Sequence, residues 1–162
     1  MRQKKYNMEK YKKLIEVVLK ETNTNIKNLY VCRYLNNSEE VYQWYKKQGT
    51  FGLQPPDKFH VTISYSKKEL DWNGISPLKS ALKIPVGQRE TLTLGNANVL
   101  KFVSPILEKR WNYFIEHGAS YDFDTYIPHM SFAYDSGQSV KNIKPFMGEL
   151  YFGPEVFDTI NE

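Results

Sequence analysis

The stretch HVTISY at residues 60–65 is the most informative part of the sequence, because HMSFAY at residues 129–134 repeats its pattern. Both read histidine, any residue, hydroxyl, apolar, small, tyrosine, and they begin 69 residues apart, one in each half of the chain. This alternation of apolar and polar residues predicts two β-strands. Side chains two residues apart on a strand point to the same face, so each histidine shares a face with the hydroxyl residue that follows it.

The opposite face of each strand is expected to be apolar. We expect Val61, Ile63 and Tyr65 to face the core, and the second strand to repeat this arrangement through Tyr134. The histidines and hydroxyls then face a cleft. A single His-x-Ser/Thr pattern is common by chance, but two matching copies in matching strand contexts are a more specific signal.

The four polar residues of the two stretches are suited to acid–base chemistry on a phosphodiester. Imidazole titrates near neutral pH, so one histidine can take a proton from an attacking hydroxyl while the other gives a proton to a leaving alkoxide. The hydroxyls can donate hydrogen bonds to the phosphate oxygens on which charge builds up. We therefore predict a catalytic set that requires no metal or other cofactor. Its members are His60, Thr62, His129 and Ser131.

Metal-binding patterns are weak in this chain. It has no HExxH motif, no His-Cys cluster and no EF-hand loop. Asp122 and Asp124 form a short acidic pair in an expected loop, and no further metal ligands accompany them at a suitable spacing. The single cysteine, Cys32, excludes an internal disulfide and a multi-cysteine zinc site. We expect no metal site.

Length and composition are typical of one soluble domain. The chain has 162 residues, of which 41% are hydrophobic and 25% charged, and this length suffices for one domain with its own core. No apolar run approaches the roughly 18–20 residues that span a bilayer. The N-terminus lacks the apolar segment of a secretory signal. We expect a cytoplasmic protein that does not bind a membrane.

The net charge of +4 is concentrated at the N-terminus. Residues 1–27 carry eight basic and three acidic residues, which leaves the remainder of the chain at −1. Apolar residues recur at helical spacing over residues 8–20, which predicts a basic helix. Its lysines either form a solvated face or attract a polyanion. We expect residues 1–26 to be an accessory helix and residues 27–162 to be a single domain.

The remaining elements mix strands and helices without strict alternation. Residues 66–80 are expected to be irregular, and residues 120–128 are expected to form a loop. This mixture predicts an α+β fold with a largely antiparallel sheet. The expected strands are 28–35, 59–65, 82–94, 97–103, 129–134 and 148–157, and the expected helices are 38–48 and 105–117.

These stretches resemble the 2H phosphoesterase superfamily, which is named for its two His-x-Ser/Thr strands. FHVTISYSKK (59–68), EHGASYDFDTYIPHMSFAYD (116–135) and the run from Phe146 to Phe157 are similar in particular to the bacteriophage anti-CBASS phosphodiesterases, which destroy cyclic oligonucleotide alarm signals. The resemblance covers about residues 28–160. The block around the second histidine is its most specific part, because other 2H enzymes lack it.

The resemblance implies a bilobal fold in which largely antiparallel sheets line a central cleft and helices lie outside. It implies metal-independent cleavage of 3′–5′ linked cyclic di- and trinucleotides, such as cyclic GMP-AMP, in the cytoplasm of an infected bacterium. His60, Thr62, His129 and Ser131 match the family's catalytic positions, with Ser131 where the phage enzymes often have threonine. Duplex DNA is not an expected partner.

Three further positions match substrate-binding residues of the family. Tyr30 and Tyr121 match aromatic positions suited to base stacking, which contributes roughly 1–3 kcal/mol per base. Glu155 matches an acidic position that could hydrogen-bond a base edge. Packing is the alternative for both tyrosines, and a solvated strand end is the alternative for Glu155.

Two other functions are compatible with these residues. One is a 2H phosphoesterase that opens 2′,3′-cyclic phosphates at RNA ends or acts on 2′–5′ links. The other is a module that binds a cyclic nucleotide without cutting it, although the presence of both histidines and both hydroxyls argues against this. The leading hypothesis is a cyclic oligonucleotide phosphodiesterase that counters host immunity.

Overall fold

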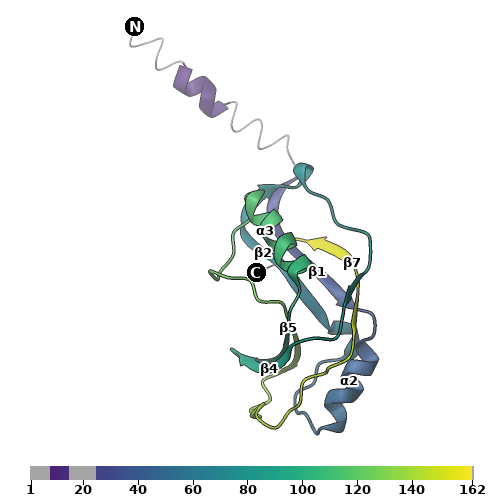
Figure 1. Ribbon diagram of the computed structural model, residues 1–162. Coiled ribbons are helices and arrows are strands. Elements are labelled where there is room, and N and C mark those ends of the chain that lie inside the picture. The colour runs from purple at the N-terminus through teal and green to yellow at the C-terminus, as the bar shows by residue number, and fades with distance from the viewer. Residues whose placement is uncertain (1–7, 15–24, 162) are drawn as a thin grey trace.

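The computed structural model describes residues 8–14 and 25–161 (Figure 1). Residues 8–14 are helical, as the sequence predicted for this part of the N-terminal segment. Residues 15–20, the rest of the expected helix, lie outside the described residues. The division at residue 26 into an accessory helix and a domain therefore stays a prediction.

Seven strands form one sheet in the described part of the chain, and all the pairings between neighbouring strands are antiparallel. Their order across the sheet is β3-β7-β1-β2-β6-β5-β4. The strands are β1 (Ile26–Leu35), β2 (His60–Asp71), β3 (Leu82–Ile84), β4 (Arg89–Leu94), β5 (Ala97–Phe102), β6 (His129–Tyr134) and β7 (Leu150–Asp158).

The sheet consists of two halves that meet between β2 and β6. β3, β7, β1 and β2 form one half, and β6, β5 and β4 form the other. Within the described residues, a single registered pair, Val61 across from Met130, joins the halves. β1 and β2, by contrast, pair along most of their length. Both motif strands therefore lie at the junction of the halves.

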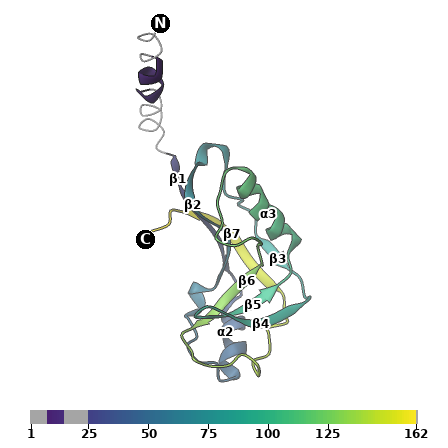
Figure 2. The same cartoon turned by 90° about the vertical axis from the view of Figure 1, so that its left-hand side faces the viewer.

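Helix α3 (Pro105–Glu116) begins where the sequence predicts. The Ser104 hydroxyl accepts a hydrogen bond from the N–H of Leu107, and Pro105 occupies the first turn, where its missing N–H costs nothing. The helix buries Leu107 and Phe114 in the core. In Figure 2, α3 lies along the upper part of the sheet.

Helix α2 (Ser38–Lys47) lies at the other end of the sheet (Figure 2). Its Tyr45 is fully buried and stacks on Phe132 of β6, with ring centres 3.8 Å apart. Residues of both helices share one buried cluster with Val61 and Met130. The two α-helices therefore pack on the sheet face that carries these apolar residues.

Two expected segments differ from the structure. The expected strand 82–94 is divided into β3 and β4, because Pro85 lacks a ladder donor and Gly87 follows it. Residues 66–71 were expected to be irregular but belong to β2, where they pair with the start of β1. Short 3-10 helices are η1 (Pro56–Lys58) and η2 (Trp72–Gly74).

The predicted α+β class is confirmed, with an antiparallel sheet and helices packed against it. No helix in the described ranges is long and apolar enough to cross a membrane.

Candidate active site

The junction of the two sheet halves brings the catalytic candidates to one face. Val61 and Met130 lie directly across from each other and are fully buried. Because the two strands are antiparallel, the residues next to Val61 and Met130 also face each other. The histidine of each strand therefore lies across from the hydroxyl residue of the other strand. Alternation turns these polar side chains away from the core, and all of them are half-buried. They are His60 and Thr62 on β2, and His129 and Ser131 on β6.

The two histidines occupy diagonal positions across this junction. His60 precedes Val61 on β2, and His129 precedes Met130 on β6. Diagonal neighbours on an antiparallel pair are roughly 7–8 Å apart. A phosphate group placed between the two rings can contact both of them.

Each imidazole is held by the same type of backbone hydrogen bond. Nδ1 of His60 lies 2.7 Å from the carbonyl oxygen of Lys58, two residues earlier. Nδ1 of His129 lies 2.7 Å from the carbonyl oxygen of Ile127, also two residues earlier. A carbonyl only accepts hydrogen bonds, so Nδ1 carries the hydrogen on both rings. Nε2 is then the basic nitrogen of each neutral imidazole.

Tyr30 on β1 contacts the first hydroxyl residue. Its phenol oxygen lies 3.2 Å from Oγ1 of Thr62, and its ring stands edge-on to His60 at 6.4 Å between centres. Burial raises the pKa of Tyr30, an effect that its bond to Thr62 opposes only partly. The phenol therefore stays protonated at neutral pH and can donate to Thr62, which leaves the threonine hydrogen for a ligand. The structure thus brings Tyr30 to the site, and its expected stacking role stays a prediction.

Side chains from two loops satisfy the backbone of the hydroxyl residues. The phenol of Tyr126 donates a 2.7 Å hydrogen bond to the carbonyl oxygen of Thr62. The amide of Gln54 donates to the carbonyl oxygen of Ser131. These two carbonyl oxygens thus have hydrogen-bond donors at the point where β2 and β6 separate and no longer pair with each other. Neither residue could be identified from the sequence, because each acts from a loop with no local motif.

A β-bulge follows the hydroxyl residue of β2. Thr62 pairs with Cys32 of β1. Ser64 pairs with the adjacent β1 residue, Val31, so Ile63 is an extra residue on β2.

A matching bulge follows the hydroxyl residue of β6. Ser131 pairs with Val99 of β5, and Ala133 pairs with the adjacent residue, Asn98. Phe132 is therefore an extra residue on β6, at the position equivalent to that of the first bulge. The two motif strands share this irregularity as well as their residue pattern.

The bulges correct the expected positions of two tyrosines. A bulge shifts the alternation of side chains by one residue. Tyr65 pairs with Tyr30, and their rings lie edge-on at 6.1 Å. Tyr134 pairs with Ala97 and is 38% exposed. The prediction that Tyr65 and Tyr134 face the core is therefore wrong, because both lie on the histidine face.

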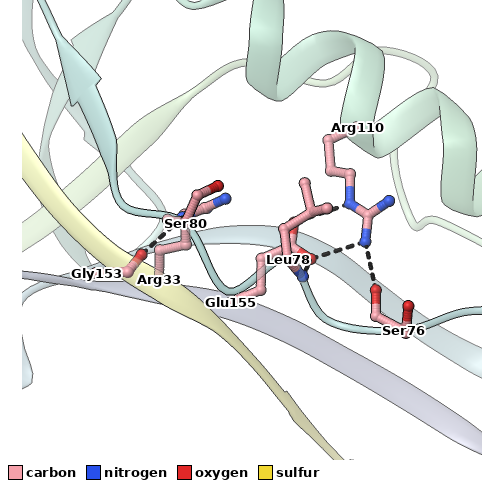
Figure 3. A network of polar contacts seen from close by, with 7 residues as sticks. All are labelled: Arg33, Ser76, Leu78, Ser80, Arg110, Gly153 and Glu155. Atoms are coloured by element: carbon pink, nitrogen blue, oxygen red, sulfur yellow. Dashed lines mark hydrogen bonds and ion pairs between the residues drawn. The ribbon is translucent and has the colours of Figure 1, made fainter.

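Glu155 lies on the opposite face, where its contacts favour a structural role, and its expected contact with a base stays a prediction. It pairs with Arg33, which also pairs with the buried Val61. Its side chain has no exposed surface. Nε and a terminal nitrogen of Arg110, from α3, donate to the two carboxylate oxygens at 2.8 Å each (Figure 3). The N–H of Leu78 donates a further 2.8 Å bond, so the carboxylate is occupied within the core face.

Tyr121 lies in an aromatic cluster beside α3. Its ring stands edge-on to Trp111 at 5.5 Å and to Tyr126 at 6.2 Å. Burial raises the pKa of the Tyr121 hydroxyl, and the neighbouring Asp122 adds to this effect. These contacts favour the packing interpretation, and the stacking role of Tyr121 stays a prediction.

Each histidine has one further neighbour that the sequence did not predict. Tyr34 of β1 lies across from His60, with ring centres 5.9 Å apart. Lys101 of β5 lies across from His129, with its ammonium 3.8 Å from a carboxylate oxygen of Glu90. The two-residue spacing of tyrosine, cysteine and tyrosine along β1 could have indicated Tyr34. Lys101 could not be found, because its position depends on the pairing of β5 with β6.

The acidic pair in the loop before β6 makes no recognisable metal site. Asp122 forms an exposed ion pair with Lys67, at 3.5 Å. In the part of the chain that the structure describes, no three His, Cys, Asp or Glu side chains group as metal ligands.

Comparison with known families gives a match over most of the chain. The family model described as anti-CBASS protein Acb1 matches residues 27–162. The chain is similar to the anti-CBASS protein Acb1 of Sphingomonas paeninsulae, with 40% identity over 144 residues, which cover 83% of this chain. It is also similar to the Acb1 protein of Escherichia phage RB16, with 32% identity over 110 residues, 67% of this chain and 64% of the relative. The matched part spans only 23% of the length of the Sphingomonas protein.

Solved structures resemble the fold. Escherichia coli LigT complexed with 3′-AMP superposes with a TM-score of 0.59 at 13% identity, over 82% of this chain and 87% of LigT. A structure described as a phosphoesterase gives a TM-score of 0.59 at 12% identity, over 81% of this chain and 86% of that one. These likenesses confirm the predicted 2H phosphoesterase-like fold.

Proposed function

The chain belongs to the Acb1 family of anti-CBASS proteins, and from this premise we propose that it is a metal-independent phosphodiesterase that opens 3′–5′ linked cyclic di- or trinucleotides. In this proposal it acts inside an infected bacterium and removes the nucleotide signal of the CBASS defence.

The observation that carries the proposal is the arrangement of the two histidines. They lie diagonally across the β2–β6 junction, and each is fixed by an Nδ1 hydrogen bond to the carbonyl two residues earlier. Both rings thus have Nε2 available for proton transfer. One ring acts as base and the other as acid on opposite sides of one phosphorus atom.

The proposed reaction is an in-line transfer at phosphorus. One neutral histidine takes the proton of a ribose 2′-OH, and the 2′-oxygen attacks the adjacent 3′-phosphorus. The P–O5′ bond breaks as the second, protonated histidine gives its proton to O5′. The ring opens to a linear product with a 2′,3′-cyclic phosphate, which water then opens with the histidine roles reversed.

The hydroxyls of Thr62 and Ser131 serve the phosphate. Each hydroxyl lies across the strand pair from a histidine. Each can therefore donate to a non-bridging phosphate oxygen while the histidines contact the attacking and leaving oxygens. Charge grows on these oxygens in the transition state, where oriented donors are most effective. The same four side chains supply base, acid and charge stabilisation, so the proposed chemistry uses no metal.

The test is incubation of the full chain with cyclic di- and trinucleotides, including cyclic GMP-AMP, in EDTA, followed by HPLC. A linear RNA with a 2′,3′-cyclic phosphate end is tested in parallel, and His60→Ala and His129→Ala are the inactive controls. We expect ring opening that both substitutions abolish and that a 2′-deoxy analogue resists. Cleavage of the RNA end alone, or recovery of intact cyclic nucleotide from a heated complex, would replace the proposal with an RNA-end enzyme or a binding module.

A further inference from the structure

The histidine face carries two tyrosines that stand in equivalent places on the two motif strands. Tyr65 and Tyr134 each follow their histidine by five residues. The matching bulges turn both of them toward the histidine face. A bulge at one strand could be an accident of packing, but the same bulge at the same motif position in both halves gives the site an approximate two-fold symmetry.

The strand registers place the two tyrosines at equal distances from the junction. On β1, the partner of Val61 is three residues from the partner of Tyr65. On β5, the partner of Met130 is likewise three residues from the partner of Tyr134. Three steps of roughly 3.3 Å put each tyrosine about 10 Å along the strand from the junction. Because β2 and β6 are antiparallel, the two tyrosines lie in opposite directions from it.

The two rings differ in their surroundings but both offer surface to a ligand. Tyr65 is half-buried and stands edge-on to Tyr30, at 6.1 Å. Tyr134 is 38% exposed, and its ring contacts no other aromatic ring among the residues that the structure describes. Packing in the core therefore explains neither the position of Tyr134 nor its orientation toward the histidine face.

We propose that Tyr65 and Tyr134 hold the two nucleosides that flank the scissile phosphate, one on each side of the histidine pair. This inference rests on the proposed function and deepens it. An internal phosphodiester carries one nucleoside on its 3′ side and one on its 5′ side, which matches a site with one aromatic residue in each direction. A phosphate at an RNA end carries only one nucleoside and leaves one tyrosine unused.

The chemistry of the pair favours nucleobases. Tyrosine rings present a face on which any base can stack, and such stacking tolerates different bases. A cyclic dinucleotide has two nucleosides around its ring, so both tyrosines meet similar partners. Glu155 faces the core and Tyr121 packs beside α3, whereas Tyr65 and Tyr134 lie on the histidine face.

The test compares Tyr65→Ala, Tyr134→Ala and Tyr134→Phe with the unaltered chain on a cyclic dinucleotide. Tyr151→Ala is the matched control, because Tyr151 is an exposed tyrosine of β7, 43% exposed, away from the junction. Each of the two site alanine variants should raise KM at least about fivefold with kcat within about twofold, the loss expected for one weak stack. Tyr134→Phe and the control should keep KM within about twofold.

A substrate with one nucleoside and no second ring, adenosine 3′-(methyl phosphate), completes the test, with its cleavage followed by HPLC. Only one of the two alanine variants should raise its KM, because only one flanking base is present. Unchanged KM for the dinucleotide in both alanine variants would overturn the inference, as would an equal effect of Tyr151→Ala. If the unaltered chain opens no cyclic nucleotide, the proposed function itself fails, and this outcome is distinct from the other two.

Discussion

At the scale of single residues, the site depends on hydrogen bonds that form within the protein before a substrate binds. Both imidazoles donate Nδ1–H to a carbonyl two residues earlier, so their tautomers are fixed before a substrate binds. On the β2 side, the hydroxyls of Tyr30 and Thr62 lie within hydrogen-bond distance, and the phenol can donate to the threonine oxygen. Burial raises the pKa of Tyr30 further above neutral, so its phenol keeps its hydrogen.

Removal of the Tyr30 hydroxyl tests this positioning role. Tyr30→Phe should lower kcat about fivefold, because a net hydrogen bond of about 1 kcal/mol no longer orients Thr62. KM should stay close to its original value, since the ring is retained. Steady-state kinetics on a cyclic dinucleotide measure both constants. An unchanged kcat in Tyr30→Phe together with a raised KM in Tyr30→Ala would show that Tyr30 only stacks on a base.

At the scale of elements, loop segments complete the separated motif strands. Residues 51–54 run beside β6, with Leu53 bridging to Ala133 and the Tyr134 N–H donating to the carbonyl of Gly52. Gly52 has a positive φ of 69°, and a Cβ there would clash with the carbonyl oxygen of Tyr134. Only glycine lets this loop approach the strand so closely.

Replacement of Gly52 by alanine should therefore lower the free energy of unfolding. Gly49 provides the control, because it has a similar φ of 72° and a Cβ there would meet no atom within 4 Å. Gly49→Ala should cost about 1–2 kcal/mol from backbone strain alone. Gly52→Ala should lower the free energy of unfolding by at least about 1 kcal/mol more than Gly49→Ala, because the strand or the loop must shift. Urea unfolding measures the difference, and equal losses in the two variants would contradict the close approach.

The buried pair of Arg110 and Glu155 joins α3 to β7 at the same scale (Figure 3). Arg110→Met should lower the free energy of unfolding by about 3–5 kcal/mol, because it leaves the Glu155 carboxylate buried without its cation. Replacement of both Arg110 and Glu155 by methionine should lower the free energy of unfolding less than Arg110→Met alone. The KM of the folded fraction for a cyclic dinucleotide should stay the same. A raised KM in Glu155→Gln with an unchanged free energy of unfolding would instead show that Glu155 contacts a base.

The sequence predicted the elements better than it predicted their irregularities. β1, α2, α3, β6 and the α+β class followed from periodicity and capping, which are local properties. The extension of β2 through Lys67, Lys68 and Glu69 was missed, because its exposed charges resemble a loop. The bulges at Ile63 and Phe132 were missed because they exist only in the pairing with neighbouring strands. The motif therefore located the four polar candidates, while the faces of Tyr65, Tyr134 and Glu155 required the registers.

At the scale of the whole molecule, the sheet formed by the described residues consists of two halves that a single registered residue pair joins. The junction carries two copies of one motif, two matching bulges and two matching histidine contacts. α2 and α3 pack on the far face, which leaves the histidine face for a ligand. The approximate two-fold symmetry suits a phosphodiester, whose attacking and leaving oxygens lie on opposite sides of phosphorus.

In the proposed function, the two histidines act together on a single phosphodiester. The most direct measurement is the single-turnover rate of cyclic dinucleotide opening in EDTA, for the unaltered chain, His60→Ala, His129→Ala and the double variant. Each single substitution should lower the rate at least about 100-fold, and the double variant should be little slower than the singles, because acid and base act as a unit. A single variant that keeps more than about a tenth of the original rate would contradict the account.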